Sequence, residues 1–163
     1  MITQNIARGL RLIPNGVFVV ASSHGDETHG FTATWVSQAS YRNALLTLAI
    51  DKGHDTYRLI QQSGHLVLNL LKSSQSAVAE HFGHSDRKSR GEYFREEDGR
   101  RIPVLRDCLA AIFCQVVGSL DARDHEVLLV EATDALVFAE GDPLVYSFQR
   151  GYAALKTGET EPS

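Results

Sequence analysis

Short apolar runs separated by turn-forming residues recur along this chain, and they constrain the fold more than any other feature. Most of the runs are too short for typical helices and rich in β-branched residues, which favours strands. They lie at 17–22, 29–40, 44–50, 65–71, 108–120, 126–138 and 144–148. Because most connections are short, we expect antiparallel pairing. The pattern predicts a mainly β protein, a Greek-key-like antiparallel barrel or sandwich, and disfavours a doubly wound parallel sheet.

Two or three short helices are expected at the periphery. Residues 2–10 have an amphipathic pattern, with Ile6 and Leu10 on one face. Asp55 is a good helix N-cap, and Gly64 supplies the stop signal. A further helix is predicted from Ser74 or Ser76 to Gly83, and the charged stretch 85–101 is predicted to be an exposed loop.

The length of 163 residues suits one domain, which we expect over residues 1–156, with 157–163 as a flexible polar tail. The formal net charge of −4 weighs against nucleic-acid binding. Apolar runs fall short of the ~20 residues that a membrane helix needs, and the N-terminus shows no targeting pattern. These features predict a cytoplasmic protein that binds neither nucleic acid nor membrane.

Cys108 and Cys114 are six residues apart in one predicted strand. Extended backbone would separate them by about 20 Å, whereas a disulfide needs Cα atoms within about 7 Å. We therefore expect two reduced, buried thiols, which fits a cytosolic protein. The histidine pairs 24/29 and 81/84 lack a clear third ligand, so no native metal site is predicted.

The segment HGFTATWVSQAS, residues 29–40, is the most informative for function. Alternation in one extended strand would put hydroxyl and amide groups on one face, with the other largely apolar. The polar set is Thr32, Thr34, Gln38 and Ser40. One interpretation is an ordinary solvent-facing strand, which alternation alone favours. The other is a polar ledge for a planar, heteroatom-rich ligand, which small residues such as Ala33 and Ala39 would allow close to the backbone.

A helix start follows the next strand and could hold an anion. Helix N-termini offer unpaired N–H groups and partial positive charge. Lys52 could pair with a phosphate there, and Thr56 could donate hydrogen bonds. The alternative is an ordinary capped helix with a surface lysine, and the carboxylate of Asp55 favours that alternative.

The chain resembles the flavin reductase-like family, which has the FMN-binding split-barrel fold, and is most similar to the flavin reductase module of diflavin flavoproteins. The stretch 29–40 carries the strongest likeness, and weaker matches follow in the family's order. They are Gly16–Val20, Leu66–Leu71, Ile102–Leu105, Asp124–His125, Pro143–Tyr146 and Gly151–Tyr152. The chain departs from the family where Asn43–Ala44 replaces Pro-Pro and where Arg123 replaces a glycine.

The resemblance implies an NAD(P)H-dependent flavin reductase that transfers hydride to FMN, works as a homodimer and serves a partner oxygenase or electron-transfer protein. It implies no obligatory acid–base residue, and it makes His125 a candidate for positioning the nicotinamide. The implied cofactor-binding residues are Thr32, Ala33, Thr34, Trp35, Gln38, Ala39, Ser40, Lys52, His54, Thr56 and Tyr152. Two alternatives stay open: a noncatalytic FMN electron-transfer module, and a split barrel that binds haem or another small molecule.

Overall fold

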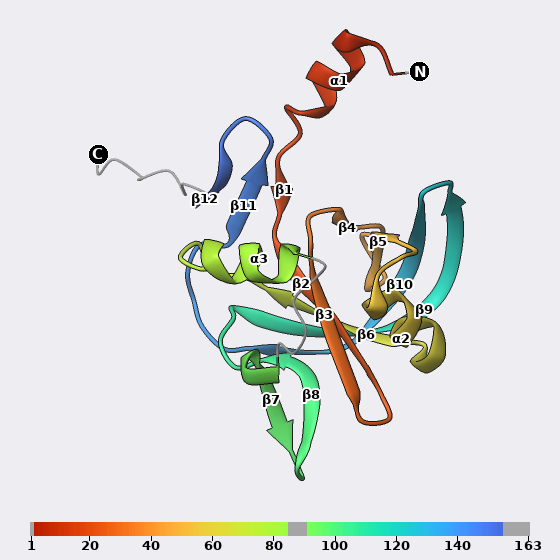
Figure 1. Ribbon diagram of the computed structural model, residues 1–163, viewed down its shortest axis with the longest axis vertical. Coiled ribbons are helices and arrows are strands. Elements are labelled where there is room, and N and C mark those ends of the chain that lie inside the picture. The colour runs from red at the N-terminus through yellow and green to blue at the C-terminus, as the bar shows by residue number, and fades with distance from the viewer. Residues whose placement is uncertain (1, 85–90, 155–163) are drawn as a thin grey trace.

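A computed structural model describes residues 2–84 and 91–154, and it confirms a mainly β fold with short peripheral helices (Figure 1). Its centre is an antiparallel seven-stranded sheet in the order β3-β2-β6-β9-β10-β5-β4. The strands are β2 (Phe18–His24), β3 (Glu27–Ala33), β4 (Val36–Gln38), β5 (Leu45–Asp51), β6 (His65–Leu70), β9 (Ala110–Ala122) and β10 (His125–Val137).

The sheet curls into a half-barrel because its two edge strands are almost continuous in sequence. β3 and β4 stand at opposite ends of the strand order, yet only Thr34 and Trp35 lie between them. The sheet must bend until its edges meet, and the Ala49 N–H donates to the Trp35 carbonyl at that junction (3.0 Å). The predicted single strand over 29–40 is therefore wrong: it is two strands with different partners, β2 for one and β5 for the other.

Two smaller sheets and the helices complete the described part of the chain. β1 (Asn15–Gly16), β11 (Leu144–Ser147) and β12 (Gly151–Ala154) form one sheet, and β7 (Phe94–Glu97) pairs with β8 (Arg100–Leu105). The helices are α1 (Gln4–Leu10), α2 (Asp55–Ser63), α3 (Ser76–Gly83) and the 3-10 turn η1 (Gly91–Tyr93). Across residues 2–84 and 91–154, no helix has the length and apolarity to cross a membrane.

The prediction of a loop over 85–101 is wrong for its second half. Residues 94–105 form the β7–β8 hairpin, and residues 85–90 lie outside the described chain. Asp98 and Gly99 both have positive φ (49° and 74°), which is the backbone of the tight turns that join hairpin strands. Phe94, Val104 and Leu105 are buried and anchor the hairpin to the body.

The core has two main parts that meet at β2. Inside the curled sheet, Leu48, Ile50, Leu68 and Leu128 pack together with no exposed surface. Under α3, a second cluster includes Val17, Phe82, Phe94 and Leu144. Alternate residues of β2 pack into different clusters: Val20 belongs to the first and Val19 to the second. The inner cluster fixes the curvature on which the candidate site depends.

The helix-start prediction was off by one residue, whereas the stop was correct. His54, not Asp55, is the N-cap of α2, and it makes no side-chain capping bond. Gly64 ends the helix in the left-handed region (φ 72°), where glycine has no steric cost. Asp55 falls in the first turn, where its carboxylate favours the helix dipole.

Both cysteines are buried and free, and burial raises the pKa of Cys108 to about 11 and of Cys114 to about 12. We expect a thiol-specific reagent such as Ellman's to label neither in the native protein at pH 8, and both after urea unfolding. Because the unfolded thiols ionise near their ordinary pKa of 9.0 while the folded ones stay protonated, stability falls as pH rises from about 9 through about 12. Rapid native labelling at pH 8 would contradict this burial.

Candidate functional site

A hollow of about 190 Å³ opens where the two edges of the curled sheet meet. It brings together three separate parts of the chain: the β3–β4 junction, the end of β5 with the start of α2, and the first residue of β10. Its lining is Phe31, Thr32, Ala33, Thr34, Trp35, Ala49, Asp51, His54 and His125. Six of these belong to the set predicted from the sequence, while Phe31, Ala49 and Asp51 were missed.

Ala49 forms part of the hollow because of its position in β5. Leu48 and Ile50, on either side of it, are fully buried in the core, so Ala49 faces outward. A methyl group at this position leaves space that a longer side chain would occupy. Only the paired register of β5 shows this, since Ala49 lies in an unremarkable apolar run of the sequence.

Two aromatic contacts form the walls. His54 stacks on Phe31, with ring centroids 4.7 Å apart and planes at 23°. His125 lies against Trp35, with centroids 5.1 Å apart and planes at 56°. Trp35 is half exposed, at 52%. The hollow therefore has flat, π-rich surfaces suited to a planar ring, with a solvent-facing indole at its mouth.

The N-terminus of α2 borders the same hollow. The Asp51 carboxylate accepts the Gly53 N–H (2.7 Å), and the Asp51 carbonyl accepts the His54 N–H (3.2 Å). His54 is the N-cap that follows this turn, and its side chain makes no capping bond to the first turn of α2. Thr56 is buried in the first turn of the helix. Such an end suits an anion because of its dipole and its donors.

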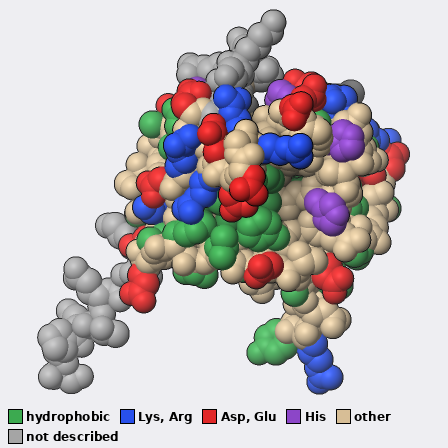
Figure 2. Space-filling view, turned by 90° about the horizontal axis from the view of Figure 1, so that it is seen from below, with side chains coloured by type: hydrophobic (Ala, Val, Ile, Leu, Met, Phe, Trp, Pro, Cys, Tyr) green, Lys and Arg blue, Asp and Glu red, His purple; other side chains and the backbone are tan. Residues whose placement is uncertain are grey.

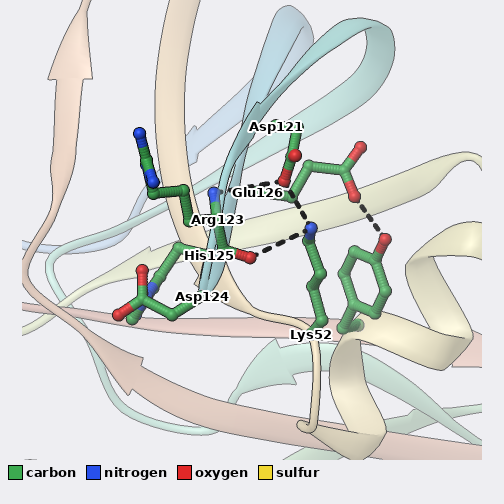
Figure 3. Close-up of polar contacts among 7 residues, drawn as sticks. Lys52, Asp121, Arg123, Asp124, His125 and Glu126 are labelled. Atoms are coloured by element: carbon green, nitrogen blue, oxygen red, sulfur yellow. Dashed lines mark hydrogen bonds and ion pairs between the residues drawn. The ribbon is translucent and has the colours of Figure 1, made fainter.

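Lys52 does not stand free beside that helix start. Its ammonium lies 2.6 Å from Asp121 Oδ1 and donates to the Arg123 carbonyl (3.3 Å), so it spans to the β9–β10 turn (Figure 3). The hydrogen bond with Asp121 raises the pKa of Lys52 and lowers that of Asp121. The sequence prediction of Lys52 near a phosphate missed this partner, which is 69 residues away.

The polar row predicted on 29–40 does not exist as one face. The Thr32 hydroxyl donates to the Ala79 carbonyl of α3 (2.6 Å). In the β4–β5 pair, Gln38 stands opposite Leu46, and both side chains lie on the same face of the sheet. Ser37 stands opposite Thr47, and this pair lies on the outer face, beside Ala49. The break after Ala33 resets the alternation. Ser37 and Thr47, which the alternation argument left out, are the hydroxyl residues that face outward.

Gln38 and Ser40 line a second hollow, of about 390 Å³, that follows β4 away from the first. Ser40 accepts the Asn43 N–H (3.1 Å), and the Ala39 N–H donates to the Leu45 carbonyl (2.8 Å), which shapes the connecting loop. Tyr41 projects from this loop fully exposed. Of the predicted residues on 32–40, the first four line the first hollow, Gln38 and Ser40 line the second, and Ala39 lines neither.

Tyr152 lies elsewhere in the fold, on β12 in the three-stranded sheet (Figure 1). Its ring contacts Tyr146 at 5.2 Å, and desolvation by burial raises its pKa. Within this chain it packs the edge of the second core cluster. Tyr152 lines neither hollow in the described chain, so its implied role in cofactor binding stays a prediction.

Another cavity, of about 380 Å³, lies beside the β7–β8 hairpin and contains none of the predicted site residues. Arg95, Ile102, Phe113 and Leu136 are among its lining. The end of the molecule where the β2–β3 and β7–β8 hairpins project carries apolar side chains bordered by charged ones (Figure 2). The first hollow is the candidate functional site, because aromatic walls and a helix start converge only there among the described cavities.

Most of the charged side chains around the first hollow form an ion pair or a hydrogen bond with another residue. Asp124 pairs with His125 Nδ1 at 3.3 Å, and that hydrogen bond lowers the pKa of Asp124. Tyr57 donates to Glu126, whose pKa is lowered by hydrogen bonds from Ser119 and Tyr57. The titratable residues in the described lining are Asp51, His54 and His125, of which Asp51 accepts the Gly53 N–H and His125 pairs with Asp124.

Comparisons with known proteins agree on one family. The model of the flavin reductase like domain matches residues 10–156. A reductase component of 4-hydroxyphenylacetate 3-monooxygenase from Thermus thermophilus is 32% identical over 141 residues, 86% of this chain and 89% of that protein. An NADPH-flavin oxidoreductase from Streptomyces viridifaciens is 35% identical over 132 residues, 76% of this chain and 66% of that protein. The solved structure of flavin reductase PheA2 superimposes with a TM-score of 0.79 at 29% identity, covering 95% of this chain and 99% of the other.

Proposed function

This chain belongs to the flavin reductase-like domain family, and on that premise we propose that it reduces FMN with NADH or NADPH at the hollow between β3, β5 and β10. The family and its relatives make it a flavin-reducing oxidoreductase. The choice of FMN over FAD, the split-barrel architecture and the residue roles are parts of the proposal. The observation that carries it is the meeting of aromatic walls with an uncapped helix start in one hollow.

The residues present fit a flavin in both shape and chemistry. Ala33 and Ala49 have short side chains that leave room for the ring. Thr34 supplies a hydroxyl, and Trp35 flanks the ring. The first turn of α2, with His54 and the backbone N–H groups that follow it, would receive the phosphate. Gln38 and Ser40 line the second hollow and Ala39 lines neither, so their flavin contacts stay a prediction. Ligands of this size occupy pockets of about 300 Å³ or more, so the hollow of about 190 Å³ holds only part of one.

Placement is the main catalytic task of this chain. Bound flavin supplies the ring that accepts hydride, and the reduced nicotinamide supplies that hydride. Trp35 and His125 stand together at the mouth of the hollow, where the second ring must arrive parallel to the first. His125, tied to Asp124, would orient the nicotinamide by hydrogen bonding. No side chain has to transfer a proton in this step.

We include in the proposal a homodimer in which a second copy covers the open site. The helix α1 buries none of its residues in the described chain, and Ile6 and Leu10 are each 52% exposed. Trp35 and Tyr41 are exposed beside the two hollows. Apolar and aromatic groups left open in this way favour a protein partner. A second subunit would also supply the part of the flavin enclosure that one chain lacks.

The physiological acceptor of the reduced flavin is proposed to be a partner oxygenase. The relative from Thermus thermophilus is a reductase component of a monooxygenase, which supports this role. Two buried, free thiols support a reducing compartment, the cytoplasm. An electron-transfer protein is the other candidate acceptor.

The test is a flavin titration followed by a nicotinamide assay. Quenching of flavin fluorescence should give saturable binding, and oxidation of NADH or NADPH, followed by absorbance, should depend on added FMN. FAD in place of FMN tests the choice of flavin, and sedimentation with and without flavin tests the dimer. Flavin binding without nicotinamide oxidation would instead identify an electron-transfer module. Haem binding with no affinity for flavin would overturn the proposal.

A further inference from the structure

The ammonium of Lys52 closes a small ring of interactions between two distant loops. It contacts Asp121 Oδ1 (2.6 Å) and the Arg123 carbonyl (3.3 Å), and the same Asp121 oxygen accepts the Arg123 N–H (3.1 Å) (Figure 3). One side chain of the β5–α2 loop therefore holds both backbone polar groups of Arg123, directly at the carbonyl and through Asp121 at the N–H.

Arg123 has a backbone conformation that needs such support. Its φ is 72°, in the left-handed region that non-glycine residues rarely adopt. Residues in this region persist where surrounding contacts fix them, and they gather at functional sites. The contacts of Lys52 and Asp121 hold both backbone polar groups of Arg123 in the turn between β9 and β10.

That turn carries His125 into the candidate site. His125 is the first residue of β10, pairs with Asp51 in the sheet register, and lies against Trp35. A second contact joins Tyr57 of α2 to Glu126, the residue that follows His125. The start of α2 and the turn are therefore held together on both sides of His125, so a change at Lys52 is transmitted to the mouth of the hollow.

The charges near Lys52 make it a poor phosphate ligand. Asp121, Asp124 and Glu126 lie on the turn side and act electrostatically on Lys52. A phosphate dianion would have to displace the Asp121 carboxylate and approach these acids. The ion pair is exposed, at 40% for Lys52 and 74% for Asp121, so its effect on overall stability is small. The ion pair still holds the local geometry of the β9–β10 turn.

We propose that Lys52 is a positioning residue for the nicotinamide nucleotide: with Asp121 it clamps the β9–β10 turn so that His125 faces the hollow, and it does not bind the flavin phosphate. This inference rests on the proposed function. It assigns the flavin phosphate to the first turn of α2 and the nicotinamide to the clamped turn.

The experiment compares Lys52→Met, Asp121→Asn and their double variant at saturating flavin. Loss of the clamp should raise KM for the nicotinamide nucleotide about three- to fivefold, the scale of one exposed ion pair, and leave kcat and the flavin Kd within about twofold. Both single variants should raise KM, and the double variant should add little, because each removes the ion pair between Lys52 and Asp121. Lys52→Arg should restore most of the KM.

Arg58 and Glu27 supply the matched control. They form another exposed ion pair of the same length, 2.6 Å, with side chains 47% and 54% exposed, from α2 to the far end of β3. Arg58→Met should leave KM unchanged. In NMR spectra of the flavin-free protein, the amide signals of residues 122–125 should move in Lys52→Met and Asp121→Asn but not in Arg58→Met.

Three outcomes would overturn the inference. Weaker flavin binding in Lys52→Met, with tighter or unchanged binding in Asp121→Asn, would make Lys52 a phosphate ligand. Unchanged KM in both single variants of an active enzyme would show that the clamp positions nothing. A wild-type protein that neither binds flavin nor oxidises NAD(P)H would refute the proposed function itself, and the nicotinamide role with it, whatever the NMR spectra show.

Discussion

Replacing Ala49 with leucine is expected to raise the flavin Kd by at least tenfold while the protein stays folded. Ala49 faces out of the barrel between two fully buried neighbours and lines the hollow of about 190 Å³. The three added carbons would occupy space that the proposed ring needs, and a cost of about 1.4 kcal/mol already corresponds to tenfold in binding. Flavin fluorescence quenching measures the effect.

The control for Ala49→Leu is Ala153→Leu, which adds the same carbons at an exposed position of β12. Its flavin affinity should match the wild type, and both variants should unfold cooperatively in urea near the wild-type midpoint. An Ala49→Leu protein that is folded and binds flavin with unchanged affinity would show that the ligand lies elsewhere, with the larger cavity beside β7–β8 the next place to examine.

Replacing Asn69 with leucine is expected to lower the free energy of unfolding by about 3–5 kcal/mol, since two buried partners and one half-buried partner would lose a hydrogen bond. Asn69 is fully buried within the apolar run of β6. Its amide donates to the carbonyls of Val19 (3.1 Å) and Pro103 (3.0 Å), and its Oδ1 accepts the Leu105 N–H (2.9 Å). Leucine matches the volume approximately but satisfies none of these groups.

Urea unfolding followed by circular dichroism measures the loss at Asn69. Asn43→Ala is the comparison, because Asn43 lies in an exposed loop, and a surface change of this kind usually stays within about 0.5 kcal/mol. If Asn69→Leu cost less than about 1 kcal/mol, the attachment of β8 to β6 and β2 would not depend on this side chain. The same variant should also loosen the β7–β8 hairpin, because β8 contains two of the three bonding partners.

The site explains how a chain without an evident catalytic dyad can be an oxidoreductase. Hydride transfer between two ring systems asks the protein to stack, orient and exclude water, and the redox chemistry belongs to the cofactors. Aromatic walls, a small-residue floor and a helix start are the parts that such a task requires. This is why a search of the sequence for paired acids, nucleophiles or metal ligands finds no clear site, whereas a strand of mixed small, polar and aromatic residues is informative.

The sequence by itself determined what depends on neighbours in the chain. Strand runs such as 44–50 and 65–71 follow from local apolar patterning, and the end of α2 follows from Gly64, the one residue type that takes φ 72° without cost. The order of weaker motifs also led to the family. Six residues of the hollow were identified before the structure, all from segments whose likeness to the family was recognised.

Only the tertiary structure decided which of those residues meet. Thr34 and Trp35 interrupt the strand predicted over 29–40, because its two halves form opposite edges of the sheet. One half pairs with β2 and the other with β5. That pairing turns Thr32 towards α3, brings Ala49 into the hollow and sets His125 beside Trp35. Lys52 and Asp121 find each other across 69 residues. Local pattern cannot encode such contacts, since they arise from how far the sheet curls, and the packing of the whole core sets that curvature.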